Sequence, residues 1–543
     1  MPPSMRDWLP AGHLVWFVLE VVAEVDTSAF HVRARTGGAG RAGFDPDMLL
    51  ALLIYAYCHG QLSSRRIEEL CRVDVAFRVI CGNDAPDHVT VARFRKANEQ
   101  AVTGLFTQVL SLCARAGLGR VGIVAIDGTK IAASAAMAAN RGGDWLRAAA
   151  AGLVRQAGEV DAAEDALFGD ARGDELPAEL ADPRSRAARI RECLGQIDEE
   201  NAAAVAAEQA KRVEAARYTE QVRSGKPPLG PVPAAVDPVE LAQARLDAER
   251  SAAATRIAGW EVKAAAAAAA GRKMTGFPPA PVGEQGRVVR AAQALAAARD
   301  TAGKAAAREA TQSPGGGSAR QASTGKPAAA GKQPQRNLTD PDSRILKTGN
   351  GWVQGYNAQI AATDDQLILA TDAVQDANDT AQLEPMMHAA AAAAAHLAAH
   401  RDEATRPRDG QGRPLPGTIG TVAADAGYDT EHNLTAPGPD RLIADTTRGQ
   451  LARDTQDQPA TGEPPPGATP RQAMNHRLRT EEGQAIYRRR SVTVEPVNGH
   501  LKDRIGLRRF SRRGLSAAKA ELKFAAACAN LLKIHRTGWS PAT

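Results

Sequence analysis

The chain has 543 residues, a formal net charge of +5 and a sequence pI of about 8.9. It is too long for one ordinary core, so we expect roughly two to four domains. The mild basic excess is consistent with a nucleic-acid partner but not diagnostic of one. Six scattered cysteines without a CxxC pair argue against a disulfide framework or a zinc ribbon and favour a reduced, cytoplasmic protein. We expect no membrane span, because the apolar run 48–58 is too short, and no signal peptide, because the first residues lack a basic start followed by an apolar core.

Residues 1–118 are predicted to form an all-α domain that binds DNA. The apolar run 48–55 follows an Asp-Pro pair, which suits the start of a buried helix. Short helices, small polar turns and a basic last helix are typical of a helix-turn-helix DNA-binding domain. A plain helical bundle with a solvated basic face explains the pattern equally well. The last helix, opened by residues 86–90, carries the candidate DNA contacts Arg93, Arg95 and Lys96.

The first strand of a second domain is predicted within residues 119–137, where apolar, mostly β-branched residues lead to Asp127 and then Gly128. Burying an unpaired carboxylate is expensive, so such an aspartate usually meets a cation. An ordinary Asp-Gly turn at the end of a strand is the alternative, and this pattern alone favours it. The odds change because the same arrangement returns downstream at Asp425.

Residues 138–336 are predicted to be an Ala-rich helical insertion followed by a linker. The composition suits antiparallel helical hairpins or a coiled coil. The segment 313–336, rich in Gly, Ser, Gln and Pro, is predicted to be a flexible linker. Long helices are expected at 184–223, 239–270 and 288–311, with Pro-rich breaks at 226–238 and 277–282.

Residues 337–543 are predicted to complete the second domain and to add basic C-terminal helices. Without the insertion, the order is strand, strand, strand, helix, strand, short strand, helix. This order is that of an α/β ribonuclease-H-like core, a mixed sheet flanked by helices. The first and fourth strands are neighbours in such a core, so Asp127 and Asp425 are placed to share a metal. Asp429, four positions after Asp425, is the main alternative candidate for a catalytic carboxylate. Asp372, Asp376 and Asp379 are interpreted as structural.

A third carboxylate, Glu495, lies in the basic tail. Pro496 is tolerated in a first helical turn, which predicts that Glu495 stands at a helix start with Lys502 on the same face about two turns later. Between Tyr487 and Arg513, nine Lys or Arg residues accompany two acids, a local net charge of +7. Such a cluster is a strong footprint for a polyanion. A solvated basic helix is the weaker alternative, because it leaves the placed carboxylates unexplained.

Together these segments resemble the DDE transposases of bacterial insertion sequences, most closely the insertion-sequence eleven-eighty-two group. The resemblance implies that Asp127, Asp425 and Glu495 form the catalytic triad and hold two Mg²⁺ ions, with Mn²⁺ as a substitute. One departure from the related Tyr-two-Arg-three-Glu-six-Lys signature is that four residues, not three, separate Arg490 from Glu495. The similar segments are 44–98, 124–130, 337–343, 355–359, 424–428, 487–502 and 510–533.

The implied activity is cutting and joining the ends of an insertion sequence by two-metal phosphoryl transfer. The implied partners are double-stranded DNA, as terminal inverted repeats and as target, and a second copy of the chain in a homodimer that bridges two ends. A bacterial, nucleoid-associated protein is expected. A catalytically silent repressor derived from a transposase is the alternative, and a purely structural helical scaffold leaves both Asp-bearing strands unexplained. The expected DNA contacts in the tail are Tyr487, Arg490, Lys502, Arg504, Arg508 and Arg509.

Overall fold

The computed structural model describes residues 5–32, 43–152, 186–226, 230–273, 276–310, 334–349, 351–403, 406, 408, 411 and 417–541. The chain forms two compact units. One consists of Met1–Cys193 with Gln335–Thr543, and the other is Leu194–Pro334. All candidate site residues belong to the first unit. No described helix combines the length and the apolar character needed to cross a membrane.

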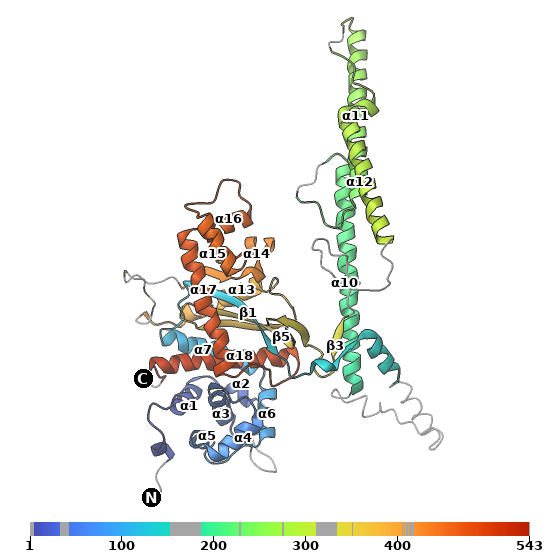
Figure 1. Ribbon diagram of the computed structural model, residues 1–543. Coiled ribbons are helices and arrows are strands. Elements are labelled where there is room, and N and C mark those ends of the chain that lie inside the picture. The colour runs from blue at the N-terminus through green and yellow to red at the C-terminus, as the bar shows by residue number, and fades with distance from the viewer. Residues whose placement is uncertain are drawn as a thin grey trace, which may run out of the picture. The chain divides into compact units, whose positions relative to one another are not determined.

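A six-stranded mixed sheet is the centre of the first unit (Figure 1). The strand order is β4-β5-β1-β7-β8, and β6 pairs with β5 as well. β1 runs antiparallel to β5 and parallel to β7, so the first and fourth predicted strands are neighbours, as expected. The strands are β1 (Ile123–Ala132), β4 (Arg344–Thr348), β5 (Gly351–Thr363), β6 (Ile368–Val374), β7 (Thr421–Ala424) and β8 (Asp440–Ile443).

Helices flank this sheet, which confirms the expected mixed sheet with flanking helices. α17 (Glu481–Gly499) packs across β1, β5 and β7, whereas α13 (Leu383–Ala399) and α18 (Leu515–Thr537) pack against β6 and β5. From Gln354 to Thr363, β5 is buried without interruption. A strand buried in this way has both faces covered, so the polar residues Asn357 and Gln359, which alternate with apolar ones along β5, are buried as well.

The N-terminal residues are helical, as predicted, and share one apolar core with the sheet and α18. The run 48–55 lies in α3 (Pro46–Cys58), where Asp45 accepts the backbone N–H of Asp47 at the N-cap. Figure 1 shows α18 between these helices and the sheet. The other helices are α1 (Leu14–Glu24), α2 (Ser28–His31), α4 (Ser64–Val73), α5 (Val75–Ile80), α6 (His88–Ala97) and α7 (Ala101–Arg115).

The insertion is helical, with bounds close to those predicted. Its helices are α10 (Arg186–Arg223), α11 (Pro238–Ala269) and α12 (Gly286–Ala310). α11 and α12 pack through an apolar cluster that includes Leu246, Val288 and Leu295. Residues 311–333 of the predicted linker lie outside the described residues.

A small sheet of two strands stands where the insertion departs and returns. β2 (Asn140–Gly142) pairs antiparallel with β3 (Gln335–Asn337). Gln335 and Arg336 are therefore strand residues and not part of a linker, a correction to the predicted end at 336. The predicted domain boundaries stay a prediction.

The rest of the C-terminal part is mostly helical. α14 (Glu431–Thr435) follows the turn after β7, and α15 (Arg448–Asp457) follows β8. α16 (Pro470–Leu478) begins at a capping box in which Thr469 and Gln472 bond each other's backbone. A π-helical turn, His500–Arg504, extends α17.

Candidate active site

Two neighbouring strands bring Asp127 and Asp425 to the same level of the sheet. The parallel register pairs Val124 with Val422 and Ala125 with Ala423. Continuing this register places Asp425, which directly follows β7, beside Asp127 in β1. Asp425 also caps the short 3-10 turn η5 (Ala426–Tyr428), where its Oδ1 accepts the Gly427 N–H at 2.9 Å.

The guanidinium of Arg490 on α17 bridges the two aspartates. Its Nη2 lies 3.0 Å from Asp127 Oδ1 and 3.2 Å from Asp425 Oδ2. Asn498, further along the same side of α17, donates from Nδ2 to Asp127 Oδ2 at 3.0 Å. Both oxygens of Asp127 are therefore held by α17, as expected where a sheet carboxylate faces a basic helix.

Asp127 carries an unfavourable charge despite this pairing. Burial raises the pKa of Asp127 to about 6, Arg490 acts in the opposite direction, and the carboxylates of Asp425 and Asp379 add to the rise. The Asp127 side chain is 16% exposed. Desolvation and like charges both favour the neutral acid, so a further cation near Asp127 would be stabilising.

Lys502 reaches the same face of β1. Its ammonium donates to the hydroxyl of Thr129, which lies two residues after Asp127 and so on the same side of the strand. Burial is the main cause that lowers the pKa of Lys502, and the Arg508 guanidinium adds to it. A cationic donor thus lies beside the two aspartates.

Glu495 stands in the interior of α17 and not at a helix start, which corrects the prediction. The helix tolerates Pro496 for a reason that lies elsewhere in the chain. Proline has no N–H to donate to the carbonyl four residues earlier, here that of Val492. This carbonyl instead accepts a hydrogen bond from Gln366 Nε2 at 3.0 Å.

Glu495 lies at the rim of the site. Its side chain is exposed and has no hydrogen bond or ion pair within the part of the chain that the structure describes. Asp127, Asp425 and Glu495 do not gather within 4.8 Å of one another, although all three are among the described residues. Asn498, one turn later, does reach Asp127. The structure therefore brings the two aspartates together, and the role of Glu495 stays a prediction.

The rival aspartates have partners of their own. Asp429 pairs with Arg471 at 3.1 Å, and Asp372 pairs with Lys519 at 2.9 Å. Asp376 accepts from Gln382 at 2.6 Å. These contacts support structural roles for all three aspartates.

The predicted DNA-contacting residues differ in exposure and in their partners within the chain. Arg93 and Lys96 on α6 and Arg504, Arg508 and Arg509 in the tail are exposed. Of these, Arg508 pairs with Asp503, and Arg509 Nη1 donates to the Ala133 carbonyl at 2.7 Å. Arg95 is instead bound to the Leu62 carbonyl at 2.8 Å and to Ser64 Oγ at 2.5 Å. Tyr487 is buried against Leu442 and Leu478.

A basic groove brings Arg509 of the tail together with Arg93 and Lys96 of α6, whereas Arg504 and Arg508 do not line it. It has a volume of about 1010 Å³ and lies between α4, α6 and residues 509–512 of the tail. The predicted residues Arg93, Lys96 and Arg509 line it, together with Arg65. The N-terminal helices and the C-terminal tail, which are far apart in the sequence, thus line one positively charged groove.

Two family models match the chain. Residues 3–97 match a transposase domain (DUF772), and residues 461–535 match a transposase DDE domain. Both matches support an insertion-sequence DDE transposase. The first match covers the helices from α1 to α6, and the second covers Glu495, Asn498 and Lys502. No curated protein and no solved structure matches the chain.

The site of the transposase fits a divalent metal ion, which DDE transposase domains generally use. Its donors are carboxylate oxygens, the hard ligands that Mg²⁺ and Mn²⁺ prefer. Asn498 adds an amide oxygen, Oδ1, that is buried without a hydrogen-bond partner in the described structure. Asn498 and Thr129 were missed from the sequence. Their only signal was spacing, since Asn498 lies two helical turns after Arg490 and Thr129 two strand residues after Asp127.

Proposed function

We propose that this transposase cuts and joins the ends of an insertion sequence by divalent-metal-dependent phosphoryl transfer within a ribonuclease-H-like core. The observation that carries the proposal is the pair Asp127 and Asp425, set side by side by β1 and β7 and bridged by the guanidinium of Arg490 on α17. The strand order, with β1 antiparallel to β5 and parallel to β7, supports the core assignment.

Asp127, Asp425 and Glu495 would hold the metal, two Mg²⁺ ions or Mn²⁺ in their place. Asn498, whose Nδ2 donates to Asp127, offers a further oxygen, Oδ1. When bound, these ions supply activation of water or of a DNA 3′-hydroxyl and stabilisation of the leaving oxygen. The raised pKa of Asp127 supports the need for such a cation.

The protein's own part in phosphoryl transfer is positioning and charge neutralisation. Arg490 neutralises Asp127 and Asp425, and its planar guanidinium is also suited to a phosphate. Lys502 holds an ammonium beside Thr129, where it is available to the DNA backbone. Both groups lie on the face of β1 that α17 covers.

Double-stranded DNA is the proposed partner, as terminal inverted repeat and as target. The groove lined by Arg65, Arg93, Lys96 and Arg509 offers several positive charges to a phosphate backbone. A homodimer that bridges two element ends completes the proposal.

Cleavage of a labelled duplex that contains the element's end and its flanking DNA tests the proposed function. Full-length protein should nick the duplex at the element's end with Mg²⁺ or Mn²⁺ and not with a chelator. Asp127→Asn and Asp425→Asn should each reduce the nicking rate by about a hundredfold or more, with unchanged DNA affinity. Tight, specific binding without nicking in any divalent metal would contradict the proposal and favour the repressor.

A further inference from the structure

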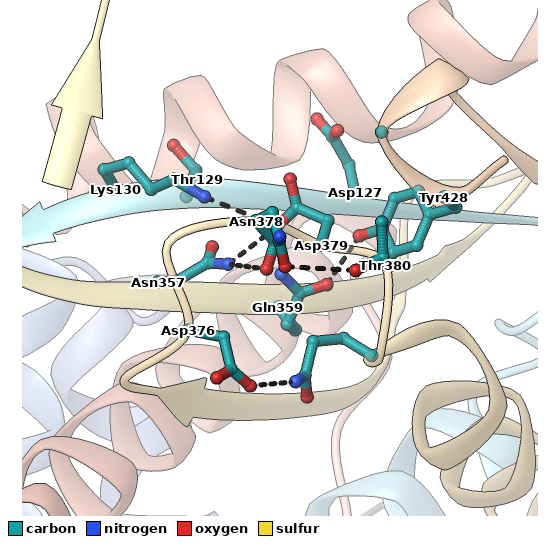
Figure 2. A network of polar contacts seen from close by, with 12 residues as sticks. Asp127, Thr129, Lys130, Asn357, Gln359, Asp376, Asn378, Asp379, Thr380 and Tyr428 are labelled. Atoms are coloured by element: carbon teal, nitrogen blue, oxygen red, sulfur yellow. Dashed lines mark hydrogen bonds and ion pairs between the residues drawn. The ribbon is translucent and has the colours of Figure 1, made fainter. Parts of the chain in front are cut away.

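Asp379 binds side chains from two strands, β1 and β5, on the face of β1 that points away from α17. Alternate residues of a strand point to opposite faces, so Asp127 and Thr129 face α17, whereas Gly128 and Lys130 face away from it. Figure 2 shows Asp379 among the polar side chains of this second face. Its Oδ1 accepts from Asn357 Nδ2 and Gln359 Nε2, each at 2.7 Å, and lies 3.4 Å from Lys130 Nζ.

Gly128 gives Asp379 the space it occupies. A Cβ atom at position 128 would lie 2.3 Å from Asp379 Oδ1 and 2.6 Å from Gln359 Nε2. Gly128 is paired with Gln359 in the middle of β1, so it is not part of an Asp-Gly turn. The glycine next to Asp127 is therefore needed for close packing, and a methyl group there would displace the carboxylate behind it.

The same cluster reaches the segment that holds Asp425. Gln359 bonds Asp379 with its amide nitrogen and accepts from the Tyr428 hydroxyl with Oε1 at 2.5 Å. Tyr428 is fully buried and ends the turn that Asp425 caps. Asp379 thus packs directly against Gly128, next to Asp127, and is linked to the turn that Asp425 caps through two side chains, Gln359 and Tyr428.

A third carboxylate close to Asp127 and Asp425 is unfavourable for folding by itself, because like charges repel. The cluster offsets this cost with one ammonium and two amides, whereas a neutral side chain would avoid the cost altogether. Local arrangements that oppose stability are expected where a site imposes its geometry. Sites that bind metals also depend on surrounding hydrogen bonds that fix their ligands.

We propose that Asp379 is a positioning residue of the transposase active site. It fixes β1 at Asp127 directly and the turn at Asp425 through Gln359 and Tyr428. The inference rests on the proposed function, because it assigns Asp379 to the site that those two aspartates form.

Asp379→Asn tests the proposal, with Asp376→Asn as the matched control. Asp376 lies in the same loop, and its carboxylate bonds Gln382 apart from the cluster (Figure 2). For Asp379→Asn we expect a nicking rate lower by about a hundredfold at saturating DNA, with unchanged DNA affinity. We also expect Mn²⁺ affinity of the DNA-free protein, measured by electron paramagnetic resonance, to fall by about tenfold or more. The control should match wild type in all three measurements, and assays run well below the melting temperature of each variant.

Three further substitutions, Gly128→Ala, Asp379→Ala and Tyr428→Phe, keep the test decisive if Asp379→Asn folds poorly. Gly128→Ala should weaken Mn²⁺ binding because its methyl group collides with Asp379. If both substitutions act through the same carboxylate, the double variant Gly128→Ala/Asp379→Ala should bind Mn²⁺ no more weakly than the weaker-binding of the two single variants. Tyr428→Phe removes one hydroxyl and should reduce nicking by about severalfold.

The outcomes separate this proposal from the proposed function. Wild-type nicking and Mn²⁺ affinity in Asp379→Asn, in a preparation where wild type is active, would overturn the positioning role. Lost Mn²⁺ affinity in Asp379→Asn together with an inactive wild type would support the positioning role and contradict transposition chemistry.

Discussion

The two faces of β1 are organised differently. On the face toward α17, Asp127 has a raised pKa, and two buried polar atoms nearby, Arg490 Nε and Asn498 Oδ1, have no partner among the described residues. On the opposite face one oxygen of Asp379 takes two amides and an ammonium, and Asn357 Oδ1 is left without a partner. The first face therefore has an uncompensated charge and unpaired polar atoms that a ligand could use. The second face has paired side chains that hold the strand in place.

The largest effect on the first face is expected from Glu495, the predicted third metal ligand. Glu495→Gln keeps size and shape but removes a charge that would hold a metal. The nicking rate should fall by about a hundredfold or more, while DNA affinity stays the same or rises slightly because one repulsion with phosphate disappears. The measurement is a duplex cleavage assay beside a binding titration.

Glu481→Gln is the control for this variant, because Glu481 is exposed in the first turn of the same helix. It should leave cleavage unchanged. Wild-type cleavage in Glu495→Gln would remove Glu495 from the site and make Asn498 the next residue on α17 to test.

The charge of Asp127 should make the metal-free protein less stable at neutral pH. The pKa of Asp127 is about 6 in the folded protein against a reference value of 3.8. The folded state therefore holds a proton that the unfolded state has lost, so stability falls as the pH rises from about 4 to about 6 and stays lower above it. Two pKa units correspond to about 3 kcal/mol.

Asp127→Asn should remove this loss, because an amide carries no charge and Asn498 Oδ1 can accept its N–H. With a chelator present, the variant should melt at a higher temperature than wild type at pH 8 and close to wild type at pH 4. An equal difference at both pH values would show that another contact, and not the carboxylate charge, sets the stability.

Arg490→Gln asks whether the guanidinium competes with a metal for the same oxygens. Removing a positive charge 3.0 Å from Asp127 should tighten Mn²⁺ binding by about severalfold. Binding to DNA should weaken, because a phosphate contact is lost. Arg488→Gln is the matched control, since Arg488 is exposed two positions earlier on the same helix. Weaker Mn²⁺ binding in Arg490→Gln would mean that Arg490 orients the carboxylates more than it competes for them.

Local patterns predicted what depends on neighbours in the chain. The apolar runs gave β1 and β7, and the Ala-rich stretches gave α10, α11 and α12 within a few residues. Glu495 was misplaced because the donor that compensates for Pro496 is Gln366, which lies 126 residues before Val492. The short strands β2, β3 and β4 were missed because they lack an apolar run and depend on their pairing.

The contacts within the site could not be predicted from local sequence patterns, because they join residues that are far apart in the sequence. Asn498 is 371 residues from Asp127, and Asp379 is 249 residues from Lys130. Only the strand register and the packing of α17 bring such residues together. Asp379 was interpreted as structural, and nothing in its own segment distinguishes it from Asp376.

The smallest expected effects concern the basic groove. There, Arg93 and Lys96 on α6 should affect DNA binding, whereas Arg95 on the same helix should affect stability. Arg93 and Lys96 are exposed, so each alanine variant should weaken DNA binding and lower the slope of log affinity against log salt by about one. Cleavage at saturating DNA should be unchanged.

Arg95 lies between Arg93 and Lys96 but bonds the Leu62 carbonyl and Ser64 Oγ. Arg95→Ala should therefore lower the melting temperature, because the partly buried Leu62 carbonyl would lose its donor, at a cost of up to about 1–3 kcal/mol. It should change the salt slope less than its neighbours do. If all three variants changed the salt slope equally and none lowered the melting temperature, Arg95 would be a DNA contact and its internal hydrogen bonds would be unimportant for stability.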